Sequence, residues 1–247
     1  MPISEKTVEL NVSRAVVEKM RRYHQIRTYS LGTSQTEEQM FGLDVEITDG
    51  TWSGGCIQYK RLKKTTAGDR WDLNHTTNRD QHSLLCTLQK AGFPVYYCLP
   101  KFDDESVLQR WSPPPIWEEV WWIPPLSLKV PKPVNDHHHL LLRTTIAPGA
   151  KKATKTWWIY SENGLQLKLV PTPFEEVEAA FMKSLGSNAT LGNLKSIVTN
   201  FAAESWHQYR EKTALRLPEK GLEKLKGAYF SNLLEGLGFM AFSNTKD

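Results

Sequence analysis

The chain has 247 residues, of which 40% are hydrophobic and 23% charged, and a formal net charge of +4. This is the composition of an ordinary folded protein, and it excludes a largely disordered or fibrous chain. At roughly 150 residues per domain, the length predicts one large domain or a domain with an appendage. The small positive charge permits nucleic-acid binding without indicating it.

The sequence also excludes several compartments and cofactors. No apolar run reaches the roughly 18 residues of a membrane span, and the first residues lack the apolar stretch of a secretory signal. We therefore expect a cytoplasmic protein that does not associate with membranes. Cys56, Cys86 and Cys98 show no CxxC spacing, so we expect reduced core cysteines. Neither a GxxxxGKS/T nor a GxGxxG motif occurs, so any ATP hydrolysis would belong to a separate chain.

Hydrophobic periodicity predicts alternating helices and strands over the first hundred residues. In chain order they are a helix at 13–24, strands at 25–31, 41–48 and 56–62, a helix at 80–91 and a strand at 95–99. A turn-rich, glycine-containing loop separates the strands at 41–48 and 56–62, so we expect them to pair as a hairpin.

The rest of the chain differs in composition. Between residues 100 and 135 prolines interrupt regular elements while tryptophans supply apolar mass, which favours a folded cover. Strands are predicted at 138–146 and 155–160, and helices at 174–185, 191–212 and 219–236. We therefore expect an α/β protein with a core over residues 1–102, a Pro/Trp-rich β extension over 103–172 packed on that core, and a helical region over 173–247.

The predicted hairpin carries the sharpest functional pattern. Strand alternation places Asp44 and Glu46 on one face of the first strand. It likewise places Gln58 and Lys60 on one face of the second strand, opposite Ile57 and Tyr59. If the two polar faces coincide, these side chains converge across about 5 Å. The alternative is that they are ordinary occupants of a solvated hairpin face.

This set of side chains suits phosphodiester cleavage. A hard divalent cation prefers oxygen ligands, and Asp44 and the amide oxygen of Gln58 offer two. Lys60 would orient water and stabilise the extra negative charge of the transition state. Because Gln58 is neutral, the metal lacks one negative charge, which Glu37, Glu38 or Glu46 could supply.

The sequence resembles the PD-(D/E)xK nuclease superfamily, in its Mrr-like QxK variant. The resemblance is carried by Glu37-Glu38, by Phe41-Gly42-Leu43-Asp44 and by Ile57-Gln58-Tyr59-Lys60-Arg61. It implies a restriction-endonuclease-like mixed sheet in residues 1–102, with the core order αβββαβ. It also implies Asp44, Gln58 and Glu38 or Glu37 as ligands of Mg²⁺ or Mn²⁺, and Lys60 as the catalytic lysine.

The resemblance implies a metal-dependent DNA endonuclease of prokaryotic antiphage defence, with catalytic residues Asp44, Gln58, Lys60 and Glu38. A separate ATPase or sensor subunit and a second copy of the chain are the expected partners besides DNA. No proline precedes Asp44, and the carboxylate of the ExK motif is absent. A nuclease fold retained as a catalytically inactive DNA-binding or assembly subunit of a defence complex is therefore the alternative function.

A basic stretch follows the predicted catalytic strand. Arg61, Lys63, Lys64 and Arg70 are opposed in the local sequence by Asp69 alone. They could bind the DNA backbone, which would make affinity depend on salt, or they could form a solvated charged loop. Gln81 opens the second helix and is a further candidate DNA contact, with a capping or surface role as its alternative.

Histidine and tryptophan groups give weaker patterns. His137 and His139 would project together from a strand, but no third zinc ligand lies nearby, so a surface or hydrogen-bonded role is favoured over a zinc hydrolase. Trp121-Trp122 and Trp157-Trp158 could stack on bases, although paired tryptophans more often fill a core or an interface.

Overall fold

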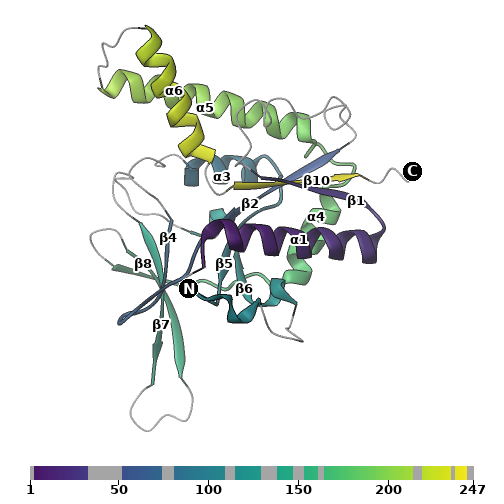
Figure 1. The fold of residues 1–247 in the computed structure, drawn as a ribbon, viewed down its shortest axis with the longest axis vertical. Coiled ribbons are helices and arrows are strands. Elements are labelled where there is room, and N and C mark those ends of the chain that lie inside the picture. Colours follow the sequence, from purple (N-terminus) through teal and green to yellow (C-terminus); the bar gives the residue numbers. More distant parts are fainter. Residues whose placement is uncertain are drawn as a thin grey trace.

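The computed structural model describes residues 3–32, 52–73, 81–108, 115–128, 138–146, 153–160, 164–213, 219–234 and 237–243. In these stretches the chain forms an α/β protein with two five-stranded sheets and five α-helices. Figure 1 shows the first sheet between α1 and the group of α3, α5 and α6, with the strands of the second sheet extending away from them.

Helix α1 (Glu5–His24) covers one face of the first sheet. Ser4 caps it, because the Ser4 side chain accepts a hydrogen bond of 3.0 Å from the backbone N–H of Thr7. Val8, Val12, Val16 and Met20 recur every four residues and are fully buried. The helix therefore begins eight residues before the predicted start at residue 13, since both the cap and the apolar spacing lie further upstream.

The first sheet has the order β1-β10-β2-β5-β6. Its strands are β1 (Arg27–Gly32), β10 (Leu237–Ser243), β2 (Ser53–Tyr59), β5 (Val95–Pro100) and β6 (Val120–Ile123). Strand β10 is antiparallel to both of its neighbours, and β2 is parallel to β5. The sequence predicted neither β6 nor β10, because the first is short and proline-flanked and the second directly follows a helical pattern.

Strand β2 differs from its predicted role as one arm of a hairpin. Over residues 56–58 both of its edges are paired, one with β10 and the other with β5. It is therefore a central strand with neighbours from distant parts of the sequence. The other predicted arm, 41–48, lies outside the described residues.

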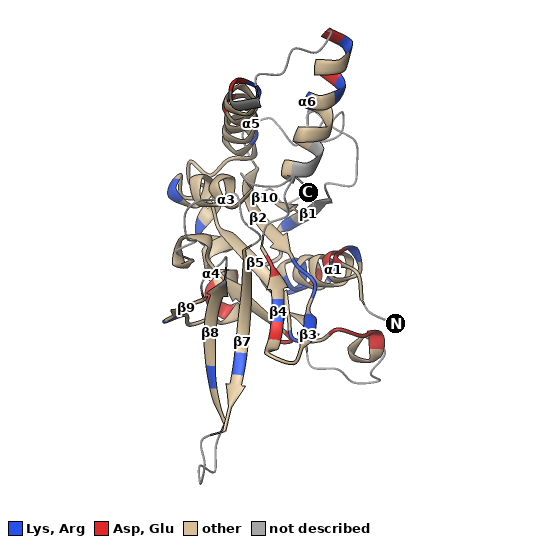
Figure 2. Ribbon diagram, turned by 90° about the vertical axis from the view of Figure 1, so that its left-hand side faces the viewer, with Lys and Arg blue, Asp and Glu red and all other residues tan. Residues whose placement is uncertain are grey.

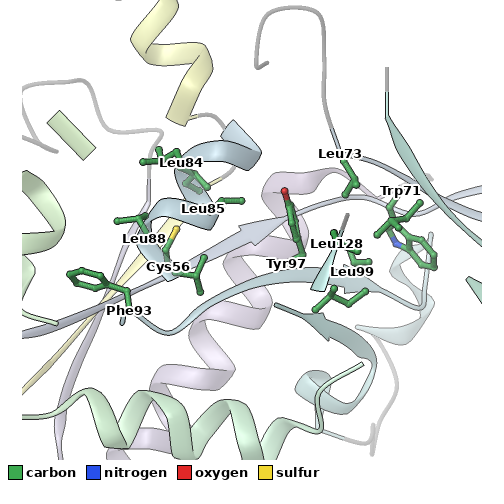
Figure 3. Close-up of a cluster of buried hydrophobic side chains, with 14 of the residues drawn as sticks. Cys56, Trp71, Leu73, Leu84, Leu85, Leu88, Phe93, Tyr97, Leu99 and Leu128 are labelled. Atoms are coloured by element: carbon green, nitrogen blue, oxygen red, sulfur yellow. The ribbon is translucent and has the colours of Figure 1, made fainter. Parts of the chain in front are cut away.

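The two faces of this sheet bury two separate clusters of side chains. On one face, Ile57 and Tyr59 of β2 pack with α1 and with α4 (Phe174–Ser184). On the other face, Cys56 packs with α3 (Gln81–Lys90) and α5 (Leu191–Thr213). Figure 3 shows Cys56 and Tyr97 beneath the leucines of α3. The sheet is therefore covered by helices on both sides, as the buried parallel pair requires.

Two glycines let helices approach β2 closely. A Cβ atom on Gly55 would lie 2.4 Å from a ring carbon of Phe181 on α4, and one on Gly54 would lie 3.1 Å from Leu194 on α5.

The helices at 174–185, 191–212 and 219–236 predicted from the sequence are confirmed as α4, α5 and α6 (Glu219–Leu234).

The second sheet is entirely antiparallel, with the order β3-β4-β7-β8-β9. Its strands are β3 (Lys63–Thr65), β4 (Gly68–Asp72), β7 (His139–Thr145), β8 (Thr154–Tyr160) and β9 (Gly164–Leu167). Strands β7 and β8 were predicted, whereas β3, β4 and β9 were not. Buried Trp71, Leu140 and Trp157 from this sheet belong to the same cluster as Cys56 and α3.

The three consecutive regions predicted from the sequence do not match the two sheets. Residues 1–102 also supply β3 and β4 of the second sheet, while 103–172 supply β6 of the first. The predicted helical region 173–247 supplies β10, the strand that joins β1 to β2. The Trp-rich segment packs into the protein as expected, since Trp122 is 1% exposed.

Candidate functional site

Gln58 and Lys60 lie at the carboxyl end of β2. The neighbouring side chains of Ile57 and Tyr59 belong to the cluster under α1, whereas Lys60 contacts α3 on the opposite face. The prediction that Gln58 and Lys60 share a face opposite Ile57 and Tyr59 is therefore confirmed. The Lys60 backbone N–H donates to the carbonyl of Cys98 at 3.2 Å, which extends the pairing with β5 beyond the last residue of β2.

Both polar side chains are buried, with Gln58 at 0% and Lys60 at 2% exposure. For these two residues the alternative of a solvated hairpin face is therefore wrong. Lysine is seldom buried, since removing its charge from water is costly without compensating partners. A buried lysine two residues from a buried glutamine is an arrangement that packing alone does not require.

Gln81, the first residue of α3, connects Lys60 to the last helix. Its Oε1 lies 3.5 Å from Lys60 Nζ, and its Nε2 donates to the carbonyl of Leu233 on α6 at 3.1 Å. The side chain is 0% exposed. Gln81 is therefore buried with its amide bonded to Lys60 and Leu233, and its contact with DNA stays a prediction.

A second group of polar residues adjoins Gln58 on the same face. Tyr97 is the parallel register partner of Gln58 on β5, and its hydroxyl lies 2.8 Å from Nδ1 of His82 on α3. His82 Nε2 lies 3.4 Å from the Cys86 sulfur. Burial, and then the proximity of His138, lower the pKa of His82 to about 4. His82 is therefore neutral at pH 7.

Sequence reasoning did not identify Tyr97 or His138 as part of this group. Tyr97 lies within an uninterrupted apolar run, and only the parallel register of β2 and β5 places it beside Gln58. His138 lies between His137 and His139, the two histidines considered for zinc, and its own side chain is 0% exposed.

The basic stretch after Lys60 is part of the β3–β4 hairpin, and carboxylates balance most of its charge. Asp72 accepts from Lys63 at 2.5 Å and from Arg70 at 2.7 Å, while Lys64 pairs with Asp103 at 2.8 Å. These contacts hold the pKa of Asp72 below its ordinary value against the opposing effect of burial. Asp69 is therefore not the only acidic residue that opposes this stretch. Asp72 follows Arg70 by two residues, and Asp103 comes from a distant part of the sequence. Arg61 is exposed.

The predicted carboxylate partners of the site are not among the described residues. Asp44, Glu37, Glu38 and Glu46 lie outside the described residues. Among the residues that are described, no three His, Cys, Asp or Glu side chains come together as a metal site. The described part of the candidate site is therefore Gln58, Lys60 and Gln81.

A cavity of about 380 Å³ lies elsewhere, between α1 and the segments around residues 107 and 116. Arg14, Glu18 and Trp117 are among its lining residues, and Arg14 and Glu18 pair with each other at 3.2 Å. Because α1 covers the face of the sheet opposite Lys60, this cavity is separate from the predicted site.

Comparisons of the chain with protein-family models, with curated proteins and with solved structures found no match. None of the described helices is both long and apolar enough to cross a membrane.

Proposed function

We propose that this protein is a metal-dependent endonuclease that hydrolyses DNA phosphodiester bonds, with a restriction-endonuclease-like sheet as its core. The observation that carries the proposal is the burial of Gln58 and Lys60 on one face at the carboxyl end of the central strand β2. Ligand sites of α/β sheets lie outside the carboxyl ends of parallel strands, which here are those of β2 and β5.

The donor chemistry of Gln58 is compatible with a hard cation. Its Nε2 donates to the carbonyl of Tyr59 at 3.0 Å, which fixes the orientation of the amide and directs its Oε1 away from that carbonyl. An amide oxygen is a ligand that Mg²⁺ and Mn²⁺ accept. Asp44 and Glu38 would supply the negative charge that Gln58 lacks.

Each residue has a distinct part in the proposed reaction. A cation held by Gln58, Asp44 and Glu38 would lower the pKa of a water molecule and neutralise charge on the scissile phosphate. Lys60 holds a fixed positive charge that stabilises the additional negative charge of the pentavalent transition state. Gln81 positions Lys60, since its Oε1 accepts from the ammonium while its Nε2 is fixed to α6.

Cleavage assays with Lys60 variants test this proposal. Supercoiled, linear and single-stranded DNA, and RNA, are incubated with Mg²⁺, Mn²⁺ or a chelator. We expect metal-dependent DNA cleavage that Lys60→Ala and Asp44→Asn each reduce by roughly two to three orders of magnitude. Cleavage by Lys60→Ala at the wild-type rate would overturn the assignment.

Lys60→Met serves as the matched control for folding. It keeps the length of the buried side chain and removes the charge, so we expect a melting temperature equal to or above that of the wild type, with cleavage still lost. If the methionine variant instead unfolds, Lys60 is a structural residue.

The Gln58→Glu variant tests the metal ligand directly. A carboxylate at this position adds negative charge to the cation site, so half-maximal cleavage should need less Mg²⁺. Without metal the new buried carboxylate should lower the melting temperature, and Mg²⁺ should restore it. A melting temperature that does not respond to Mg²⁺ would contradict a ligand role for Gln58.

The alternative function, an inactive DNA-binding or assembly subunit, is favoured by one observation. Gln58 and Lys60 are 0% and 2% exposed, whereas a catalytic centre has to admit its substrate. This alternative predicts binding without metal, no cleavage, and no effect of Asp44→Asn. A role in prokaryotic defence, with a separate ATPase or sensor subunit, would suit either function.

A further inference from the structure

Strands β7 and β8 form an arm that projects from the body of the protein (Figure 1). They pair from His139 and Tyr160 to Thr145 and Thr154. Beyond Leu142 and Trp157, where the pairing with β4 and β9 ends, they continue as a two-stranded ribbon of three residue pairs, roughly 10 Å long. The base of the arm is anchored by buried Leu140 and Ile159. The outermost residues, Thr145 and Thr154, are exposed.

The arm is cationic, and its strands carry no acidic side chain. Over the described residues 139–146 and 153–160 it contains Arg143 and Lys155 and no Asp or Glu. In the described part of the arm, Arg143 and Lys155 are accompanied by four threonines, at positions 144, 145, 154 and 156. This differs from the β3–β4 hairpin, where carboxylates lie among the cations. Figure 2 shows basic positions on both projecting strands.

The two cations lie on opposite faces of the arm. Arg143 pairs with Thr156, and Lys155 pairs with Thr144, so they occupy consecutive positions of the ladder and point to opposite sides. Arg143 lies over the Trp158 ring at 5.1 Å, and Lys155 lies 5.9 Å from the Trp121 ring. Lys101 lies 4.1 Å from the same Trp121 ring, which adds a third cation at the base of the arm.

A polyanion with a wide groove is the partner that fits this shape. The major groove of B-form DNA, about 12 Å wide, admits a two-stranded β-ribbon. Cations on both faces of the ribbon would meet phosphates on both walls of the groove, and threonine hydroxyls can bond phosphates or base edges. The major groove of A-form RNA is deep and narrow, which excludes such a ribbon.

We propose that the β7–β8 arm enters the major groove of duplex DNA and holds it through Arg143 and Lys155. The choice of DNA rests on the proposed function, whereas the contact itself needs neither metal nor cleavage. The arm would also replace the predicted DNA contacts at Lys63, Lys64 and Arg70, which are paired with carboxylates.

The test measures binding of a labelled duplex of about 25 base pairs by fluorescence anisotropy in chelator, at several salt concentrations. We expect Arg143→Gln/Lys155→Gln to weaken binding at low salt by about tenfold or more. The plot of log affinity against log salt should become less steep. The magnitude of its slope should decrease by about 1.8, the value for two lost phosphate contacts. The matched control is Lys220→Gln/Lys224→Gln, which removes two exposed charges from α6 and should leave the slope unchanged.

Three outcomes would overturn the proposal. They are an unchanged slope for the arm variant, an equal loss in the α6 control, and competition by single-stranded DNA or duplex RNA as strong as that by duplex DNA. Thr154→Glu, which places a carboxylate on the exposed end, is a second variant in case the first one folds poorly, and it should also weaken binding. Duplex binding that depends on the arm, without cleavage by the wild type, would refute the endonuclease and leave this inference standing.

Discussion

The neutral state of His82 makes the stability of the protein depend on pH. Its pKa is about 4 in the folded protein because of burial and the nearby His138, and about 6.5 in an unfolded chain. Above pH 6.5 the residue is neutral in both states. As the pH falls from about 6.5 towards 4, the unfolded chain takes up a proton that the folded protein does not, so the free energy of unfolding decreases.

We predict that His82→Gln removes part of this dependence. When the pH is lowered from about 7 to 4.5, the free energy of unfolding of the wild type should decrease by about 2 kcal/mol more than that of the variant. Urea denaturation at the two pH values measures this difference. Ser83→Ala, at an exposed position next to His82 on α3, removes no titratable group and is the control that should behave as the wild type does. Equal losses in the wild type and in His82→Gln would show that His82 is not the group responsible.

At the scale of residues, the sequence predicted relations within one strand better than relations between strands. The shared face of Gln58 and Lys60 follows from alternation along β2 and was predicted. The contact of Lys60 with Gln81 requires the position of α3, which the spacing of Leu84 and Leu88 does not give. The carboxylate that pairs with Lys64 is Asp103, a residue from a distant segment, so local charge counting overestimated the basic character of this surface.

Gly55 tests how tightly α4 packs on the central strand. We predict that Gly55→Ala destabilises the protein by about 1 to 3 kcal/mol, because the added Cβ would lie 2.4 Å from the Phe181 ring. Gly227→Ala in α6 is the matched control, since nothing lies within 4 Å of its added Cβ. It should stabilise the protein by about 0.5 to 1 kcal/mol through helix propensity. A neutral Gly55→Ala variant in thermal and urea unfolding would contradict the close approach of this helix.

At the scale of elements, long periodic segments were predictable and short strands were not. The predicted helices at 174–185 and 191–212 match α4 and α5 within two residues. Strands β3 and β9 have three and four residues, too few for a period to be recognised. Strand β10 has a continuous apolar sequence directly after α6, and such a run is compatible with a buried strand or with more helix.

At the scale of the whole molecule, the two sheets share one hydrophobic core. Cys56 of the first sheet and Trp71 and Trp157 of the second belong to the same buried cluster. The Trp71 indole N–H also donates to the carbonyl of Pro100 at the end of β5, at 3.0 Å. These contacts oppose independent unfolding of either sheet.

We therefore predict a single cooperative unfolding transition. Far-ultraviolet circular dichroism and tryptophan fluorescence should give coincident urea curves with the same midpoint. Fragment 1–102, the predicted core region, should not fold alone because it lacks β6 and β10. Two separated transitions, or a folded fragment, would show that the sheets are independent units.

The central position of β10 also affects how the protein can be made. A ribosome adds residues from the N-terminus onwards, so β1 and β2 emerge long before residues 237–243, the strand that pairs with both of them, have been added. During that interval each has an edge available for pairing with other chains, which is a known route to aggregation. The sheet is therefore incomplete until residue 243 has been added, and a chaperone that covers these edges during that interval would limit aggregation of nascent chains.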